Sequence, residues 1–219
     1  MKKITVITGH YGSGKTNLSV NLAVKAAQEG KEVTVVDLDL VNPYFRTADF
    51  REMFSGMGIK LIAPDFACSN LDVPSIQFDI EQLAGSDGCL IIDVGGDDAG
   101  AFALGRFSEA LNRFGDELDM FYVLNQRRYL TENSGEAVSL MFEIEKAARM
   151  RHTAVVNNTN LGCETTPAII SQSDDFARET AAAAGLPLAF TTCPEELCEL
   201  IDKPDIFPVK VYVKPLWDL

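Results

Sequence analysis

The chain has 219 residues, 47% of them hydrophobic and 23% charged, which is enough apolar material for one globular domain with a buried core. A formal net charge of −13 repels phosphate backbones and anionic lipids, so we expect neither a nucleic acid nor a membrane as a partner. Five scattered cysteines without C-x-x-C spacing are typical of reduced thiols, so a cytoplasmic location is expected. Because the chain has only two histidines, a histidine-rich metal site is excluded.

Apolar runs that are typical of strands alternate with helix-like stretches along the chain. The expected strands are residues 3–8, 32–37, 59–64, 88–94, 119–125, 152–158 and 186–190. The expected helices are residues 17–30, 47–58, 74–85, 99–115, 131–150 and 167–185. Most of these strands are apolar from end to end, as strands buried on both faces are, and their alternation with helices predicts βαβ units. We therefore predict a three-layer α/β/α fold with a mostly parallel sheet of about seven or eight strands, in one domain over residues 1–219.

Local signals indicate where some elements begin and end. Thr166 followed by Pro167 predicts a helix start, and Gly30 and Gly185 predict helix ends. Residues 209–213 alternate between apolar and polar side chains, which predicts an edge strand that ends at Pro215.

The segment GHYGSGKT lies between the first expected strand and the first expected helix. It matches the pattern G-x-x-x-x-G-K-[ST], whose glycines let successive backbone N–H groups face one anion at a helix N-terminus. Lys15 adds a positive charge near the β- and γ-phosphates, and the Thr16 hydroxyl is suited to Mg²⁺. The residues expected to bind the nucleotide here are Gly9, His10, Tyr11, Gly12, Ser13, Gly14, Lys15, Thr16 and Asn17.

An acidic residue ends the fourth apolar run, CLIIDVGG. Asp93 stands where a carboxylate holds a water molecule on Mg²⁺, so it is a predicted metal-site residue. The same stretch resembles the D-x-x-G element, in which the glycine amide senses the γ-phosphate; Gly96 takes that place. The alternative for Asp93 is a turn carboxylate at a strand end, and for the segment after it an ordinary acidic helix start at Asp97 and Asp98.

The second expected strand ends in VVDLDL, which contains Asp37 and Asp39. Together with the phosphate loop, Asp93 and the later VVNN strand, this D-x-D pair resembles the MinD/ParA/Mrp group of P-loop ATPases, the deviant Walker A class that also includes nitrogenase iron protein and metal-insertion ATPases. The resemblance implies ATP and Mg²⁺ as cofactors, with Thr16, Asp37 and Asp93 around the metal. It implies a catalytic role for Lys15 and Asp37, with Asp39 positioning the attacking water. The alternative is that one aspartate of the pair simply caps a turn.

One position departs from the resembled pattern. The family's loop carries a signature lysine that reaches the phosphates of a dimer partner, and here His10 takes its place. A neutral imidazole supplies no permanent charge, so a nucleotide-dependent homodimer needs another cation. Arg46 is the first candidate and Arg127 or Arg128 the second; the alternative is that each is a solvated surface arginine.

The residues that contact the base are expected after two later strands. The segment Asn157–Asn160 stands where guanine-specific P-loop proteins have N-K-x-D, and it lacks the carboxylate that accepts two hydrogen bonds from guanine. In the resembled ATPases an asparagine here contacts adenine, and the loop after the next strand, here at Cys193 and Pro194, completes the pocket. We therefore favour ATP over GTP, with Asn157, Asn158 and Pro194 at the base; the alternative is that both asparagines are turn residues.

Two functions remain open. The first is a slow switch ATPase whose segments 41–46 and 95–100 respond to hydrolysis and act on a protein partner. The second is a small-molecule kinase or ATP-dependent ligase, in which Arg46, Arg127 and Arg128 bind an anionic acceptor. A nucleotide-binding module without turnover is a weaker alternative. The acidic charge argues against DNA partitioning, the short strand-like tail against an amphipathic membrane anchor, and the cysteine spacing against a bridging iron–sulfur cluster.

Overall fold

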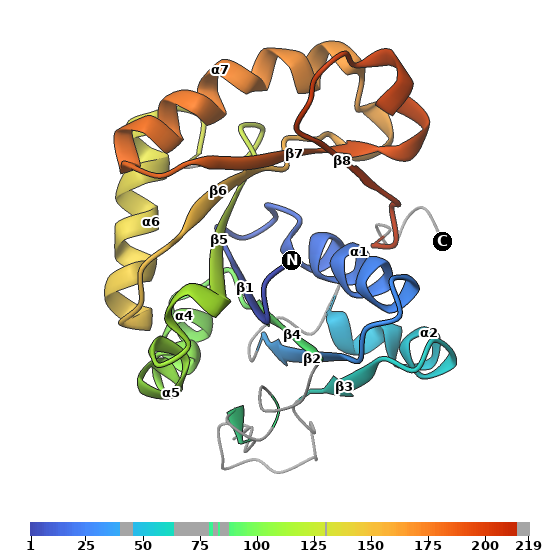
Figure 1. The fold of residues 1–219 in the computed structure, drawn as a ribbon. Helices are drawn as coiled ribbons and strands as arrows, with labels where there is room; N and C mark the ends of the chain where they lie inside the picture. The colour runs from blue at the N-terminus through green and yellow to red at the C-terminus, as the bar shows by residue number, and fades with distance from the viewer. Residues whose placement is uncertain (40–45, 64–78, 81–82, 84–87, 130, 214–219) are drawn as a thin grey trace, which may run out of the picture.

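The architecture was determined from a computed structural model, which describes residues 1–39, 46–63, 79–80, 83, 88–129 and 131–213. One eight-stranded parallel sheet, with the order β3-β2-β4-β1-β5-β6-β7-β8, runs through the molecule (Figure 1). Its strands are β1 (Ile4–Thr8), β2 (Val33–Leu38), β3 (Lys60–Ile62), β4 (Cys89–Val94), β5 (Leu118–Leu124), β6 (Ala154–Asn157), β7 (Leu188–Pro194) and β8 (Ile206–Val209). The predicted α/β fold with a parallel sheet is confirmed.

Helices cover both faces of this sheet, which makes three layers (Figure 1). The α-helices described are α1 (Lys15–Gln28), α2 (Arg51–Gly56), α4 (Asp98–Gly105), α5 (Ser108–Asn112), α6 (Ser134–Ala148) and α7 (Pro167–Ala184). Short 3-10 turns are η1 (Thr47–Phe50), η2 (Gly115–Glu117), η3 (Gly162–Glu164) and η4 (Glu195–Leu200). None of the helices in the described ranges is long and apolar enough to cross a membrane.

The apolar strands create two cores, one on each face of the sheet. Every residue of β1, β2 and β4 is buried, which explains why these strands are apolar from end to end. Alternation along β1 sends Ile7 into the core under α1 and α2, while Ile4 and Val6 enter the core under α4, α5 and α6. A second cluster on that latter face joins β5 and β6 to α6 and α7.

Several predicted helix ends are confirmed. The Thr166 hydroxyl accepts a hydrogen bond from the Ile169 N–H, Pro167 is the first residue of α7, and Gly185 follows the helix with a φ of 68°. The single helix expected over residues 99–115 is instead two, because the chain turns after Gly105, whose carbonyl accepts from the Ser108 hydroxyl.

The expected C-terminal edge strand is misplaced. The edge strand is β8, which ends at Val209, so it shares one residue with the predicted span 209–213. The segment after it bonds to α1 instead: Asn17 and Asn21 both donate to the Lys210 carbonyl, and the Tyr212 N–H donates to Asn17. The expected helix over 74–85 falls largely outside the described residues, as do residues 41–45 of one expected switch and Pro215.

Candidate functional site

The phosphate loop and the two predicted metal carboxylates meet at one edge of the sheet. In a parallel sheet all carboxyl ends lie at the same edge, where open α/β folds bind their ligands. The loop follows β1, and β1 pairs with β4, which carries Asp93. Asp93 and Asp37 are direct register partners on β4 and β2, so the fold brings together groups that are 56 residues apart in sequence (93 − 37).

The backbone of the loop depends on its glycines. Gly9, Gly12 and Gly14 have φ values of 144°, 73° and 87°, which residues with side chains rarely adopt. Gly14 precedes α1, so the loop opens onto the N-terminus of a 14-residue helix. A side chain at Gly14 would also collide with Asn158, whose Nδ2 lies 2.3 Å from an ideal Cβ. This backbone forms the kind of concave surface that binds an anion.

Lys15 is buried beneath this loop. Its Nζ donates to the His10 carbonyl at 3.1 Å and lies 2.8 Å from where a side chain at Gly96 would begin. Burial lowers the pKa of Lys15, while Asp93, Asp39 and Asp97 act in the opposite direction. A buried ammonium in this place offers a charge to an anion without much competition from water.

The carboxylates of Asp37 and Asp93 lie behind Lys15, and they differ in how many of their oxygens accept hydrogen bonds. Both oxygens of Asp37 are engaged, one by the Asp39 N–H at 2.9 Å and the other by the Ala48 N–H at 3.1 Å. Burial, together with repulsion from Asp93, raises the pKa of Asp37 to about 6, although Arg46 opposes the shift. Burial raises the pKa of Asp93 as well.

The oxygens of Asp93 fit a divalent cation. One oxygen accepts from the Thr47 hydroxyl, whereas Oδ1 is buried and has no hydrogen-bond partner among the described residues. The Thr16 hydroxyl is close enough to lower the pKa of Asp93. An unpartnered carboxylate oxygen beside a hydroxyl is a suitable pair of ligands for Mg²⁺, which usually takes its other ligands from water and phosphate. No group of three or more metal-ligating side chains occurs in the part of the chain that the structure describes.

The arginines proposed to replace the signature lysine occupy different places. Arg46 is 4% exposed, and its Nη2 lies 3.3 Å from Asp37, so it is part of the buried carboxylate cluster. Arg127 and Arg128 are exposed and follow β5. Arg128 contacts the loop, where its Nε donates to the Gly12 carbonyl at 2.9 Å.

The asparagines expected at the base are engaged with the protein. Asn158 donates to the Ser13 carbonyl at 2.6 Å and accepts from the Thr192 hydroxyl, so it connects the phosphate loop to β7. Asn157 is buried, donates to the Ser173 hydroxyl at 2.9 Å and accepts from the Thr159 N–H.

The other predicted nucleotide contacts surround the loop. Asn17 bonds through both side-chain atoms to the segment after β8. Tyr11 is 58% exposed at the loop surface. Partial burial lowers the pKa of His10, and the positive charge of Lys15 lowers it further. Pro194 ends β7, and its carbonyl accepts from the thiols of Cys193 and Cys198.

One feature of the site was not expected from the sequence: the Thr47 hydroxyl donates to Asp93, and Thr47 lies in a segment without a recognisable motif. The Asp97 carboxylate caps α4 by accepting from the Gly100 N–H at 2.9 Å, which agrees with the helix-start alternative.

Comparison with known proteins identifies one relative in sequence and several structures with a similar fold. A curated relative, the tyrosine-protein kinase YwqD of Bacillus subtilis, is 40% identical over 62 residues, which are 28% of this chain and 26% of the kinase. The FtsY proteins of Thermotoga maritima and Mycoplasma mycoides have a similar fold, with TM-scores of 0.56 and 0.60 and identities of 18% and 15%. Signal recognition particle 54 kDa protein of Aeropyrum pernix, solved with GDP, has a TM-score of 0.54 and 17% identity.

The chain spans less than two thirds of each of these relatives. The match to each FtsY protein includes 89% of this chain, and it includes 63% of the Thermotoga protein and 61% of the Mycoplasma protein. The match to the 54 kDa protein includes 87% of this chain and 41% of that protein. The model of the CobQ/CobB/MinD/ParA nucleotide-binding domain matches residues 4–131, a range that contains the phosphate loop, Asp37 and Asp93. The chain belongs to the CobQ/CobB/MinD/ParA nucleotide-binding domain family.

Proposed function

We propose that this protein binds ATP with Mg²⁺, hydrolyses it slowly, and uses the resulting change of state to regulate or load a protein partner. The observation that carries the proposal is the grouping of a glycine-rich loop, a buried ammonium at Lys15 and the unpartnered oxygen of Asp93 at one edge of the sheet. These are the parts from which P-loop proteins build a triphosphate site.

Each residue has a role that follows from its position. The loop amides and Lys15 hold the β- and γ-phosphates, so Lys15 exchanges the His10 carbonyl for phosphate oxygen. Thr16 and Asp93 hold Mg²⁺, which neutralises charge that develops on the phosphates when it is bound. Asp37 orders the segment behind them through its contacts with Asp39, Ala48 and Arg46.

Asp39 is the proposed residue for positioning the attacking water. It follows β2 at the carboxyl edge, and its Oδ1 lies 3.2 Å from where a side chain at Gly95 would begin. The Gly95–Gly96 segment therefore lies between Asp39 and the phosphate loop. Movement of this segment on hydrolysis would carry the change to α4, which begins two residues later.

Arg128 is the cation best placed to act beside the loop. Arg46 is buried against Asp37 and is therefore assigned to the stability of the carboxylate cluster. Arg128 is exposed and already contacts Gly12, so it can reach phosphate charge within this chain or in a homodimer partner. The kinase alternative has less support, because Arg46 is occupied by the ion pair and the kinase relative matches over only 28% of the chain.

Steady-state release of ADP from ATP and Mg²⁺ tests the proposal, with Arg128→Ala compared with Arg127→Ala as the neighbouring exposed control. We expect slow turnover that Arg128→Ala lowers at least about tenfold and Arg127→Ala leaves within about twofold. Light scattering with ADP and with a non-hydrolysable ATP analogue then shows whether Arg128 acts within one chain or across a homodimer. No ADP formation despite tight binding would instead support a binding module without turnover.

A further inference from the structure

A hollow lies at the edge of the sheet opposite the phosphate loop. It has a volume of about 460 Å³, within the range of about 300–1,000 Å³ that ligand pockets occupy. Its lining comes from α5, the start of β5, the end of α6 and the residues just before β6. We call it the basal pocket, because it lies at the amino ends of β5 and β6.

The basal pocket is apolar inside and cationic at its rim. Phe142, which is 46% exposed, supplies the accessible apolar side chain of the hollow, and behind it the lining includes Leu111, Leu118 and Met150, which are almost fully buried. The cations are Lys146, Arg149 and Arg151. A hollow with an apolar wall and a few charged groups at one side is the usual form of a site for an amphipathic ligand.

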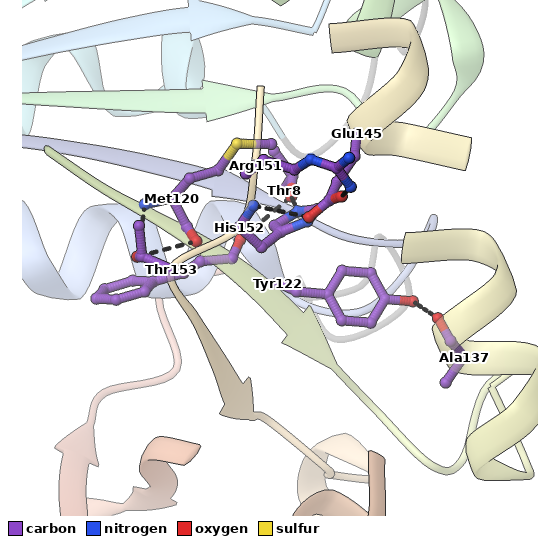
Figure 2. Close-up of polar contacts among 9 residues, drawn as sticks. Thr8, Met120, Tyr122, Ala137, Glu145, Arg151, His152 and Thr153 are labelled. Carbon is purple, nitrogen blue, oxygen red and sulfur yellow. Dashed lines mark hydrogen bonds and ion pairs between the residues drawn. The ribbon is translucent and has the colours of Figure 1, made fainter. Parts of the chain in front are cut away.

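The one carboxylate in the lining, Glu145, is already paired with hydrogen-bond donors of the protein. It accepts from the backbone N–H of His152 at 2.9 Å, from the His152 ring and from Arg151. Figure 2 shows the ring of His152 between Glu145 and Thr8, with Arg151 on the far side of the carboxylate. Burial works against ionisation, but these hydrogen bonds lower the pKa of Glu145 to about 2, so it stays charged and paired.

The rim therefore carries an excess of positive charge in a protein whose net charge is −13. Arg151 is paired with Glu145, while no carboxylate lies within ion-pair distance of Lys146 or Arg149 among the residues described. Asp119, at the start of β5, is paired with Lys2 at 2.9 Å. Cations also suit the C-terminus of α6 through the helix dipole, but the dipole does not require an apolar hollow beside them.

The backbone of Arg149 adds an independent sign that this rim is constrained. Arg149 follows α6 with a φ of 54°, where glycine or asparagine is usual, and this is the one positive φ at a non-glycine residue within the described ranges. Its guanidinium donates to the Gly105 carbonyl, which holds this cation at the rim. The backbone N–H of Arg149 donates to the Glu145 carbonyl, so this left-handed residue closes α6.

We infer that the basal pocket is a second ligand site, for a small organic anion with an apolar body. The apolar part lies against Phe142, and the anionic group faces Lys146 and Arg149. A carboxylate, sulfonate or phosphate monoester on a ring or short chain has this chemistry. The inference is independent of nucleotide binding, because no residue of the basal pocket belongs to the phosphate loop.

The test compares two probes with the same ring, naphthalene-2-sulfonate and the uncharged 2-naphthylmethanol, by backbone amide NMR titration of the whole chain. We expect saturable shifts that centre on Phe142, Lys146 and Met150, with the sulfonate at least about fivefold tighter than the alcohol. Lys146→Glu should weaken the sulfonate at least about tenfold and leave the alcohol within about twofold. Lys60→Glu, at an exposed lysine on β3, is the matched control and should change neither probe.

Three results overturn the inference: no saturable binding, shifts centred outside the basal pocket, or equal effects of Lys146→Glu and Lys60→Glu. Lys146→Gln is the milder variant if the charge reversal fails to fold, and it should weaken the sulfonate in the same direction. A failure to bind ATP would refute the proposed function and leave this test unchanged.

Discussion

At the scale of single residues, Gly96 is where the phosphate loop and the segment after β4 come closest. An ideal Cβ on Gly96 would lie 2.7 Å from both the backbone N and the Cα of Tyr11. Backbone atoms cannot rotate away as a flexible side chain can, so the loop itself would have to move. This contact makes the position of the loop depend on the segment that follows Asp93.

Gly96→Ala is therefore expected to lower the free energy of unfolding by about 1–3 kcal/mol and to weaken ATP binding at least about tenfold. Urea denaturation and calorimetric titration measure the two effects. Gly56→Ala is the control: it lies in α2 with open space around the new methyl group and should be neutral or slightly stabilising. Equal effects from the two substitutions would show that the close approach at Gly96 is unimportant.

At the scale of elements, β1 carries two buried threonines with different hydrogen bonding. Thr8 is the last residue before the loop, and its hydroxyl lies 2.7 Å from Nε2 of the His152 ring (Figure 2). The same hydroxyl donates to the Phe121 carbonyl at 3.2 Å. The Thr5 hydroxyl is buried without a hydrogen-bond partner among the described residues. The strand is thus connected at its carboxyl end to the segment between α6 and β6.

Thr8→Val should lower the free energy of unfolding by about 1–3 kcal/mol, because it removes the hydroxyl that bonds to the buried His152 ring nitrogen. Thr5→Val replaces an unpartnered hydroxyl by a methyl group of similar size, so it should be neutral or stabilising. Chemical denaturation of both variants at pH 7 makes the comparison. A larger loss in Thr5→Val than in Thr8→Val would contradict the hydrogen bonding described for β1.

Helix α6 contributes a pH-dependent part of the stability through Glu145. Because the folded pKa of about 2 lies below the ordinary value of 4.5, the ionised carboxylate stabilises the fold above pH 4.5. This contribution is lost as the pH falls from about 4.5 towards about 2.

Glu145→Gln should cost roughly 2–3 kcal/mol at pH 7, with the difference from the unsubstituted protein shrinking towards zero near pH 2. Glu143→Gln, an exposed neighbour on the same helix, should show no such dependence. Urea unfolding at a series of pH values provides the measurement. A constant difference from pH 7 to pH 2 would mean that the contacts of Glu145 do not depend on its charge.

At the scale of the whole molecule, the sheet and the place of the phosphate loop were predictable because their signals are local. Fully apolar strands, a glycine-rich turn and an aspartate at the end of β4 each stand in a short stretch of sequence. A parallel sheet then brings the carboxyl ends of β1, β2 and β4 to one edge, so the meeting of Asp37 and Asp93 also followed.

The remaining features depend on contacts between distant segments. Asn17 was expected at the nucleotide, but its amide is bonded to residues about 193 to 196 positions away in sequence. The same contacts draw residues 210–213 away from the expected edge strand. Likewise, neither the burial of Arg46 against Asp37 nor the contact between Arg128 and Gly12 leaves a periodic pattern from which it could be read.

The most direct test of the account is calorimetric titration of the protein with ATP and Mg²⁺, beside Lys15→Ala and the exposed control Lys31→Ala. The account predicts one saturable site, at least about tenfold weaker in Lys15→Ala and unchanged in Lys31→Ala. The absence of heat with any purine nucleoside triphosphate, or full affinity in Lys15→Ala, would contradict it.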